Sequence, residues 1–335
     1  MIRVAINGFG RIGRIAFREM ITGRDFDIVA VNDLSNAEEL AYLLKYDTNH
    51  RSFHEDEISF DNDNIVIAGK KRVKVLSEAD PSKLPWGDLN IDVVLECSGR
   101  FTKYEDAYKH ITAGARHVVI SAPGKGDMKT IVYGVNDSIL DGSEEVISAA
   151  SCTTNCLAPV LNVIEKNIGI RKGYMSTVHA YTNDQATLDI HHSKGIMARR
   201  GRACAQNIVP ASTGAASAIG KVIPSLLGKM DGMAFRVPVS CGSVVDLTLE
   251  LEKDVSKEEL NDLLRNNQSE ALKVCEDPIV SSDVLGKKCG ALVDLLSTNV
   301  LETEAGNLVK VVAWYDNEMG YSMQMVRTAK RFLSK

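Results

Sequence analysis

The amino-acid sequence predicts an α/β protein with two domains: a doubly wound parallel sheet over residues 1–150 and an α+β domain with a mainly antiparallel sheet over residues 151–317. The length of 335 residues is enough for two domains of ordinary size. Short apolar runs alternate with helical patterns in the first half, whereas the second half contains runs with a period of two. The last stretch, residues 318–335, is expected to form a helix that packs back on the first domain.

Alternating strand and helix patterns define the first domain. Residues 3–7 and 27–33 form short β-branched runs, and helical patterns follow them at 13–21 and 37–47. This order is typical of right-handed βαβ units and a parallel sheet. The remaining expected strands are nearly all apolar, as strands buried on both faces should be. They are residues 91–97, 117–121, 130–135 and 145–148, with a helix at 104–114.

A different pattern begins after Ser148. A helix is predicted over residues 152–167 and a strand over 172–179. Residues 247–251 alternate leucine with polar side chains, which is typical of an antiparallel strand with one solvated face, and 307–314 repeats this pattern. Helices such as 256–264 would cover this sheet, and 191–205 is predicted to be a long functional loop.

The composition excludes several classes of protein. Apolar residues make up 44% and charged residues 25%, which is typical of globular proteins. No apolar stretch approaches the roughly 18 residues that span a bilayer. The first residues also lack the basic start and the longer apolar core of a secretory signal, so we expect a cytoplasmic protein.

Charge and cysteine content narrow the possible ligands. The net charge is −5, so no global positive field favours nucleic acid or an anionic membrane as a partner. Any anionic ligand must therefore be held by local groups. The seven cysteines include no Cys-x-x-Cys pair and no zinc-ligand spacing, so we expect no metal site and free thiols in a reducing compartment.

A glycine-rich turn after the first expected strand predicts a dinucleotide site. Gly8, Gly10 and Gly13 have the spacing Gly-x-Gly-x-x-Gly between a strand and a helix, as in Rossmann-type domains. The first glycine permits the tight turn, the second lets a pyrophosphate approach the backbone, and the third lets the helix pack on the strand. Asp33 ends the next strand, where its carboxylate can accept the ribose hydroxyls of NAD and repel the 2′-phosphate of NADP. FAD or another nucleotide is the alternative ligand.

Cys152 is the candidate nucleophile. Ser151 is a suitable N-cap residue, which would place Cys152 in the first turn of the helix that follows. The helix dipole and the unpaired N–H groups at that position are expected to lower the pKa of the thiol. A buried structural cysteine is the alternative, since free cysteine is among the most buried residue types. Cys156 lies one turn further on, too far for an unstrained disulfide, and is expected to be a packed thiol.

His179 is the candidate base for this thiol. It follows a predicted strand and leads into a loop, from which an imidazole can reach a neighbouring site. A Cys–His pair would activate the sulfur and move protons near neutral pH. The other histidines considered are expected to be solvated surface residues: His110, His117, His191 and His192.

Small hydroxyl residues and arginines are candidate anion ligands. Residues 210–216 form a loop that enters a helix, with hydroxyl and N–H groups at its start. Arg236 stands among apolar neighbours, and a buried arginine usually has an anionic partner. That partner is either a phosphate or a carboxylate of the protein. Arg199, Arg200 and Arg202 in the long loop could equally form a solvated face or a subunit contact.

Together these motifs resemble the phosphorylating, NAD-dependent glyceraldehyde-3-phosphate dehydrogenase family. The resemblance extends from Val4 to the C-terminal helix. It is carried by residues 6–14 (INGFGRIGR), 149–159 (AASCTTNCLAP), 211–216 (ASTGAA), 233–238 (MAFRVP) and 314–318 (WYDNE). The family likeness implies a Rossmann-type NAD-binding domain, an α+β catalytic domain and a homotetramer in which the long loop contacts a neighbouring subunit.

The resemblance also implies a reaction. Cys152 would attack the aldehyde of glyceraldehyde 3-phosphate, with His179 as base and hydrogen-bond donor. Hydride transfer to NAD would leave a thioester, which inorganic phosphate would release as 1,3-bisphosphoglycerate, a step of glycolysis or gluconeogenesis.

Family resemblance assigns the remaining site residues by position. The substrate phosphate would be bound by Thr182, Arg236 and Arg200, and the attacking phosphate by Ser151, Thr153, Thr213 and Gly214. The cofactor would contact Gly8, Gly10, Arg11, Ile12, Gly13, Asp33, Ser121 and Asn317. The long loop departs from the family pattern, since Ile190-His191-His192 stands where relatives commonly carry a proline. The preference for NAD therefore rests on Asp33. The loop is also about one residue longer than in close relatives, so the choice between Arg199 and Arg200 stays open.

Two other functions are compatible with the same fold. Erythrose-4-phosphate dehydrogenase has a similar nucleophile but hydrolyses its acyl-enzyme, and the retained Asp33 and Thr182 speak against it. A main role as a binder of RNA, a cell-surface ligand or a partner protein has no support from the acidic net charge.

Overall fold

The protein folds into two compact units. The computed structural model describes residues 1–304 and 306–334. The first unit contains Met1–Tyr133, Asp137–Ser151 and the chain from Ser322 onward, and the second contains Gly134–Asn136 and Cys152–Tyr321. Within the described part of the chain, no helix combines the length and the apolar character needed to cross a membrane.

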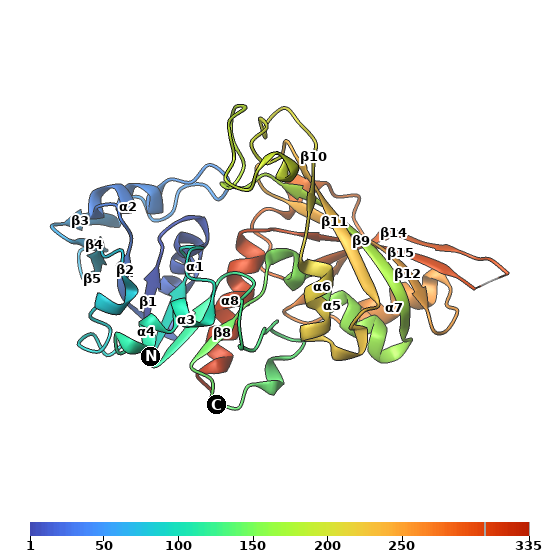
Figure 1. Ribbon diagram of the computed structural model, residues 1–335, viewed down its shortest axis with the longest axis horizontal. Helices are drawn as coiled ribbons and strands as arrows, with labels where there is room; N and C mark the ends of the chain where they lie inside the picture. The colour runs from blue at the N-terminus through green and yellow to red at the C-terminus, as the bar shows by residue number, and fades with distance from the viewer. Residues whose placement is uncertain (305, 335) are drawn as a thin grey trace. The chain divides into compact units, whose positions relative to one another are not determined.

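An eight-stranded sheet forms the centre of the first unit, in the order β3-β4-β5-β2-β1-β6-β7-β8 (Figure 1). The strands from β5 to β8 in this order pair in parallel, while β3 (Ile58–Asp61) and β4 (Asn64–Ile67) add an antiparallel hairpin at the β5 edge. The strand order reverses between the neighbouring strands β1 and β6, and doubly wound sheets bind ligands at such a position. The parallel strands are β5 (Lys71–Leu76), β2 (Phe26–Asn32), β1 (Ile2–Asn7), β6 (Val93–Glu96), β7 (His117–Ile120) and β8 (Val146–Ser148).

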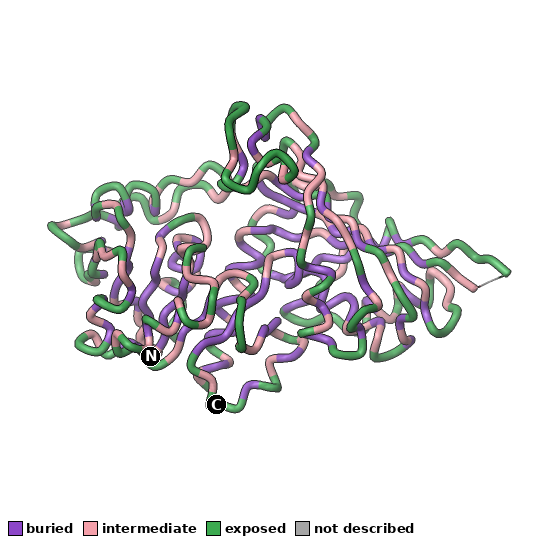
Figure 2. Tube along the Cα trace, viewed as in Figure 1, coloured by how far each residue is buried: buried purple, intermediate pink, exposed green. Residues whose placement is uncertain are grey.

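Apolar side chains cover both faces of this sheet, as predicted for its buried strands. Ile6 of β1 packs in one core cluster, together with residues of α1 (Arg11–Thr22), α2 (Ala37–Lys45) and α8 (Met319–Phe332). Ala5 packs in a second cluster on the opposite face, around Trp86. Figure 2 shows the central strands as buried stretches between exposed loops. The α8 residues Met325 and Phe332 lie in the first cluster, so the end of the chain packs on this sheet.

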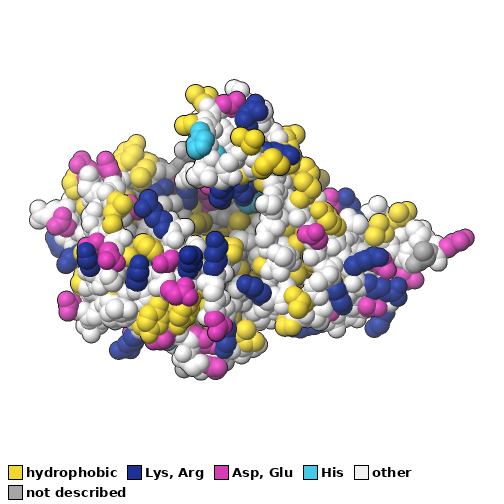
Figure 3. Space-filling model, in the orientation of Figure 1, with side chains coloured by type: hydrophobic (Ala, Val, Ile, Leu, Met, Phe, Trp, Pro, Cys, Tyr) yellow, Lys and Arg dark blue, Asp and Glu magenta, His cyan; other side chains and the backbone are white. Residues whose placement is uncertain are grey.

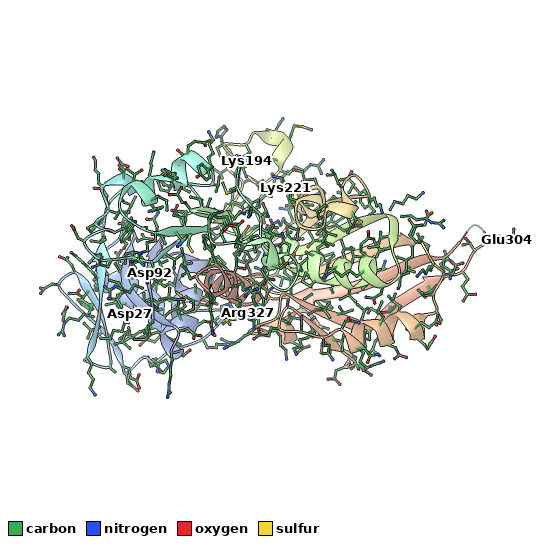
Figure 4. The ribbon with its side chains drawn as sticks, turned by 90° about the horizontal axis from the view of Figure 1, so that it is seen from below. Asp27, Asp92, Lys194, Lys221, Glu304 and Arg327 are labelled. Atoms are coloured by element: carbon green, nitrogen blue, oxygen red, sulfur yellow. The ribbon has the colours of Figure 1, made fainter. Side chains whose placement is uncertain are left out.

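At the base of the sheet, Arg3 connects neighbouring strands. Its guanidinium pairs with Asp27 on β2 at 3.1 Å, and its amide donates to Asp92, which precedes β6, at 2.8 Å. Both carboxylates are labelled in Figure 4. These contacts stabilise the amino ends of the strands. The candidate site lies at the opposite, carboxyl ends.

The structure corrects two local predictions in the first half. Residues 130–135 form no strand, because pairing stops after an isolated bridge from Thr130 to Ser148 and Gly134 then turns the chain with φ +78°. A short apolar run cannot be distinguished from a strand by its pattern alone. The predicted helix at 104–114 divides into α3 (Tyr104–Ala107) and α4 (Lys109–Thr112).

The second unit contains a seven-stranded sheet in the order β10-β11-β9-β12-β15-β14-β13. All neighbours are antiparallel except the pairs β11–β9 and β13–β14, so the predicted fold class is confirmed. The helices α5 (Cys152–Asn167), α6 (Ala215–Val222) and α7 (Lys257–Asn266) contact its strands. The strands are β10 (Val209–Ser212), β11 (Met230–Val237), β9 (Ile170–Ala180), β12 (Ser243–Leu251), β15 (Leu308–Tyr315), β14 (Ala291–Leu301) and β13 (Leu272–Cys275).

A long loop, residues 181–208, joins β9 to β10. Its only helical turn is the 3₁₀ segment Ile196–Ala198, so the prediction of a long irregular segment is confirmed. Several large apolar side chains are exposed on it, and Ile196 reaches 92% exposure. Figure 3 shows hydrophobic and charged side chains mixed on this loop, and Figure 4 labels its Lys194. The loop thus presents apolar surface that a single chain does not cover.

Candidate active site

The glycine turn between β1 and α1 is shaped by steric limits on the backbone. Gly8 has φ +90°, and a Cβ there would lie 2.4 Å from the amide nitrogen of Ser98. A Cβ on Gly13 would lie 2.3 Å from the carbonyl oxygen of Gly8. Gly10, by contrast, has no atom within 4 Å of its Cβ position. The first and third glycines are therefore required by the fold, while the second leaves open backbone for a ligand.

Asp33 lies directly after β2 and beside this turn. Its carboxylate accepts hydrogen bonds from the amide of Phe9 at 2.7 Å and from the amide of Ser35 at 3.3 Å. Gly8, Gly10, Asp33 and Phe101 help to line a pocket of about 260 Å³. An acidic group and the glycine turn therefore line the same pocket, which fits a ribose with free hydroxyls.

The other cofactor residues predicted in the first unit also lie near the carboxyl ends of the parallel strands. Arg11 and Ile12 open α1 directly after Gly10, where a helix presents N–H groups and a partial positive charge. The Arg11 guanidinium pairs with Asp47, and although burial opposes this, the hydrogen bonds from Arg11 and His50 lower the pKa of Asp47 to about 2. Ser121 follows β7, and its amide donates to the Glu96 carbonyl at 2.9 Å.

Cys152 and His179 are brought together in the second unit. Cys152 is the first residue of α5, as predicted, and His179 lies near the end of β9. The Cys152 Sγ lies 3.4 Å from the His179 Nε2, and the imidazole is only 2% exposed. The His179 Nδ1 lies 2.7 Å from the carbonyl oxygen of Ala180. A hydrogen on Nδ1 would be donated to this carbonyl and would leave Nε2 free to accept a proton from the sulfur, whereas an unprotonated Nδ1 would accept from the Arg236 Nη1, 2.7 Å away. The proposed base role of His179 requires the first tautomer.

The pKa of the thiol differs from the sequence-based expectation. Burial raises the pKa of Cys152, while Arg236 and hydrogen bonds from Thr153 lower it without cancelling the effect of burial. The predicted net lowering is therefore wrong, because desolvation of the sulfur outweighs the favourable groups at the head of the helix. Burial and the nearby Arg236 together lower the pKa of His179 to about 3, so the imidazole is neutral near pH 7.

Buried hydroxyl groups fix the position of the His179 imidazole relative to the first turn of α5. The Tyr315 hydroxyl lies 2.9 Å from the Thr153 hydroxyl and 2.8 Å from the Thr177 hydroxyl. The Tyr315 ring also meets the His179 ring in an edge-on contact with centroids 5.8 Å apart. Tyr315 thereby connects α5, β9 and β15. Cys156 is buried behind this group, its thiol 3.7 Å from the Ala313 carbonyl, so it is a packed thiol as predicted.

Arg236 links the Cys152–His179 pair to a cluster of charged residues. Its Nη1 lies 2.7 Å from the His179 Nδ1, 3.0 Å from the Ala180 carbonyl oxygen and 3.3 Å from the Thr182 hydroxyl. The Arg236 Nε is buried and has no hydrogen-bond partner. Because a buried N–H of a cation is costly to leave unpaired, this group fits an anionic ligand.

Arg200 joins the same cluster through Asp184. The Thr182 hydroxyl donates to the Asp184 carboxylate at 2.5 Å, and Arg200 forms an ion pair with that carboxylate. Although burial opposes this, the Thr182 hydrogen bond and Arg200 lower the pKa of Asp184. Arg199 is exposed, so Arg200 is the loop arginine that lies with Thr182. Two cations surround one carboxylate here, which leaves a local positive charge for an anion.

The remaining predicted phosphate ligands occupy helix starts. Ser151 directly precedes α5, and Ala150 before it has φ +59°, a strained conformation for alanine that marks the sharp turn into the helix. Gly214 precedes α6, and the Thr213 hydroxyl accepts a hydrogen bond from the Ala215 amide at 3.2 Å. Helices α5 and α6 are in contact.

Asn317 lies in the second unit, just before α8. Its side-chain oxygen accepts hydrogen bonds from the Gly242 amide at 3.1 Å and from the Ser243 hydroxyl at 3.0 Å. The Ser243 hydroxyl also accepts from the Ala180 amide at 3.0 Å, next to His179. Because the Asn317 oxygen is held by donors, its NH₂ group is the end oriented for a ligand carbonyl.

Known proteins resemble both units. Residues 2–104 match the family model described as glyceraldehyde 3-phosphate dehydrogenase, NAD binding domain, and residues 151–317 match the model for the C-terminal domain. The chain is 53% identical over 332 residues to glyceraldehyde-3-phosphate dehydrogenase of Clostridium acetobutylicum, with 99% of this chain and 98% of that protein covered. The enzymes of Clostridium pasteurianum and Streptococcus pyogenes are 54% and 49% identical, with the same shares covered.

The chain belongs to the glyceraldehyde-3-phosphate dehydrogenase family. The resemblance inferred from the motifs is thereby confirmed. All seven cysteines are among the described residues and have free thiols.

Sequence reasoning missed some of the residues that shape this family site. Asp184 and Tyr315 were not singled out, although Asp184 stands two residues after Thr182 and its position could have been a signal. The expectation that His110 is a solvated surface residue is wrong, because this histidine is 0% exposed. Among the others, His191 is exposed, whereas His117 and His192 are half-buried.

Proposed function

We propose that this protein oxidises and phosphorylates D-glyceraldehyde 3-phosphate, with NAD as oxidant and inorganic phosphate as co-substrate. The observation that carries the proposal is the Cys152 sulfur, 3.4 Å from the His179 Nε2 and next to Arg236, in a chain of this family. A thiol paired with a neutral imidazole suits covalent attack on an aldehyde. The product is 1,3-bisphosphoglycerate.

The first half of the reaction forms an acyl group on sulfur. The Cys152 sulfur bonds to the aldehyde carbon while its proton passes to the His179 Nε2, which then gives this proton to the former carbonyl oxygen to complete a thiohemiacetal. His179 then accepts the hydroxyl proton as the C–H bond breaks, and the carbon becomes a thioester on Cys152. NAD, when bound, supplies the acceptor for the hydride that leaves this carbon.

The second half releases the product. An oxygen of inorganic phosphate attacks the thioester carbon, the C–S bond breaks, and the electron pair returns to the Cys152 sulfur. The acyl phosphate that forms retains part of the free energy of oxidation, which hydrolysis would lose.

Cationic and hydroxyl groups are proposed to bind the two phosphates. Thr182, Arg200 and Arg236 would hold the phosphate of the substrate, and the unpaired Nε of Arg236 supports this role. The attacking phosphate would contact four residues at helix starts: Ser151, Thr153, Thr213 and Gly214. The N–H groups at a helix start favour such an anion.

The cofactor is proposed to lie along the glycine turn. Gly8, Gly10, Arg11, Ile12 and Gly13 would hold the pyrophosphate, which the open Cβ position of Gly10 supports. Asp33 would bind the adenosine ribose and select NAD against NADP. Ser121 and the NH₂ group of Asn317 would contact the nicotinamide half.

Two further properties are proposed from surface and composition. The exposed apolar side chains of the long loop, such as Ile196 and Met197, support a homotetramer in which this loop is covered by a neighbouring subunit. The free thiols support a location in the cytoplasm. Light scattering on the protein as it elutes from a size-exclusion column would measure the mass of the assembly. A monomer would contradict the proposed homotetramer.

The reaction is tested by NADH absorbance with glyceraldehyde 3-phosphate and NAD, with and without inorganic phosphate. We expect turnover that requires phosphate, and a loss of at least about 10³-fold in Cys152→Ser. Cys275→Ser, in β13, is the matched control and should keep wild-type activity. Turnover without phosphate would indicate an enzyme that hydrolyses its acyl intermediate, and full activity in Cys152→Ser would overturn the mechanism.

A further inference from the structure

A buried histidine in the first unit has a defined tautomer. His110 on α4 is 0% exposed, and its Nδ1 accepts a hydrogen bond from the Trp86 indole N–H at 2.9 Å. An indole nitrogen can only donate, so Nδ1 carries no hydrogen and Nε2 carries the ring hydrogen instead. That Nε2 lies 2.9 Å from the Glu96 carboxylate and therefore donates to it.

Glu96 at the end of β6 is a buried carboxylate whose partners are all donors. One oxygen accepts from His110 and from the Asn7 side-chain amide at 2.5 Å. The other accepts from the Ser98 amide at 2.8 Å and the Ser98 hydroxyl at 2.5 Å. The side chain is 1% exposed. Such a group persists in a protein interior only when its oxygens are hydrogen-bonded, so each donor is needed to hold it.

These hydrogen bonds continue across neighbouring strands. The Asn32 side chain, at the end of β2, donates to the Asn7 oxygen at 2.7 Å and to the Glu78 carbonyl at 2.8 Å. Its own oxygen accepts from the Glu78 amide at 2.9 Å. Because β2, β1 and β6 are adjacent in the sheet, the network joins their carboxyl ends to each other and to the segment that follows β5.

The network forms one wall of the pocket beside the glycine turn. Asn7, Asn32, Glu78 and Ser98 all line this pocket of about 260 Å³, together with Asp33. His110 does not line it, but its ring meets the edge of Phe101, a lining residue, with centroids 6.4 Å apart. His110 therefore contacts the residues of this pocket indirectly. It bonds to Glu96, which holds Ser98, and its ring packs against Phe101.

We propose that His110 is a positioning residue for the dinucleotide, which acts through its Nε2–H donor to Glu96. The donor fixes the Glu96 carboxylate, which in turn fixes Ser98 and Asn7 where they face the adenosine end of the ligand. The inference rests on the proposed function, in which this pocket receives NAD. The histidine itself touches neither the cofactor nor the reacting atoms.

Two substitutions of His110 test the roles of its two ring nitrogens separately. His110→Gln places an amide NH₂ near the Nε2 position and keeps a donor for Glu96. His110→Asn places its amide near the Nδ1 position, so it keeps a partner for Trp86 and loses the donor. His117→Gln is the control, because His117 lies in the same unit and lines a different groove.

The readout is the dissociation constant for NAD and for AMP, measured by calorimetry on the purified protein. We expect His110→Asn to weaken both about fivefold to tenfold, with kcat and the KM for glyceraldehyde 3-phosphate unchanged. His110→Gln and His117→Gln should stay within about twofold of wild type. A role in stability alone would lower the melting temperature without this selective loss of nucleotide affinity or its rescue by glutamine.

Two results would overturn the proposal: wild-type affinity in His110→Asn, or an equal loss in His110→Asn and His110→Gln. If His110→Asn does not fold, Trp86→Phe replaces it, because phenylalanine keeps an aromatic ring at this buried position and lacks the N–H that orients the His110 ring. A severalfold loss of AMP affinity supports the proposal, and wild-type affinity overturns it. Wild-type protein that binds NAD but reduces none with the aldehyde would refute the proposed function and leave this inference standing.

Discussion

The glycine turn of the first unit and the Cys152–His179 centre of the second are built in different ways. The turn is one continuous segment, in which Gly8 and Gly13 leave no room for a Cβ. The catalytic centre is assembled from α5, β9 and β11, and its properties depend on burial and on the charge of Arg236. The first site is fixed by steric exclusion, whereas the second is a balance of opposing electrostatic effects.

This difference separates the effects expected of mutations. A substitution in the turn should change folding or nucleotide affinity and leave the reactivity of the thiol unchanged. A substitution in the catalytic centre should change reactivity and leave NAD affinity unchanged. Each prediction below tests one side of this separation.

The largest effect is expected from His179→Asn. Asparagine keeps an amide near the Nδ1 position, next to Ala180 and Arg236, but removes the Nε2 that faces the sulfur. Loss of the base should lower kcat about 10³-fold while the dissociation constant for NAD stays within about twofold. Steady-state kinetics and calorimetry measure the two quantities, and a parallel loss of NAD affinity would break the proposed separation.

The next effect concerns stability in the glycine turn. Gly13→Ala would place a Cβ 2.3 Å from the Gly8 carbonyl oxygen, so we expect the free energy of unfolding to fall by about 2–4 kcal/mol. Gly10→Ala is the matched control, because its Cβ meets nothing within 4 Å. It should change stability by about 1 kcal/mol or less and weaken NAD binding about tenfold. Equal stability of the two variants in urea titrations would refute the steric interpretation.

A smaller effect, with a defined dependence on pH, is expected from Arg236→Leu. Arg236 lowers the pKa of Cys152, so its removal raises that pKa and reduces the thiolate fraction at any pH below it. The profile of alkylation rate by iodoacetamide should therefore move to higher pH, and the KM for glyceraldehyde 3-phosphate should rise about 10-fold to 100-fold. Arg236→Lys, which keeps the charge, should keep the alkylation profile. A shift to lower pH in Arg236→Leu would contradict the assigned sign.

The smallest effect is expected from Asp33→Ala. The carboxylate beside the Phe9 amide is proposed to exclude a 2′-phosphate, so its removal should raise the ratio of NADP to NAD efficiency about tenfold. The ratio follows from kcat/KM with each cofactor. An unchanged ratio would show that another segment controls the choice of cofactor.

How much could be predicted from sequence follows from the same contrast. The roles of Gly8 and Gly13 depend on local backbone geometry, so their spacing was sufficient to predict them. The Cys152–His179 pairing was also predicted, because a helix start and a strand end are local features. The net pKa of Cys152 and the burial of His110 depend on neighbours distant in sequence, and no local pattern encodes them. The strand predicted at residues 130–135 is absent for a related reason, because apolar content does not specify strand pairing.

The central claim is that the Cys152 sulfur bonds covalently to the substrate carbon. The most direct measurement is mass spectrometry of protein quenched in acid after mixing with glyceraldehyde 3-phosphate and NAD in the absence of phosphate. The account predicts a 3-phosphoglyceroyl group that fragmentation locates on Cys152, absent in Cys152→Ser and removed by added phosphate. An acyl group on Cys156 or any other residue, or turnover with no acylated protein, would contradict it.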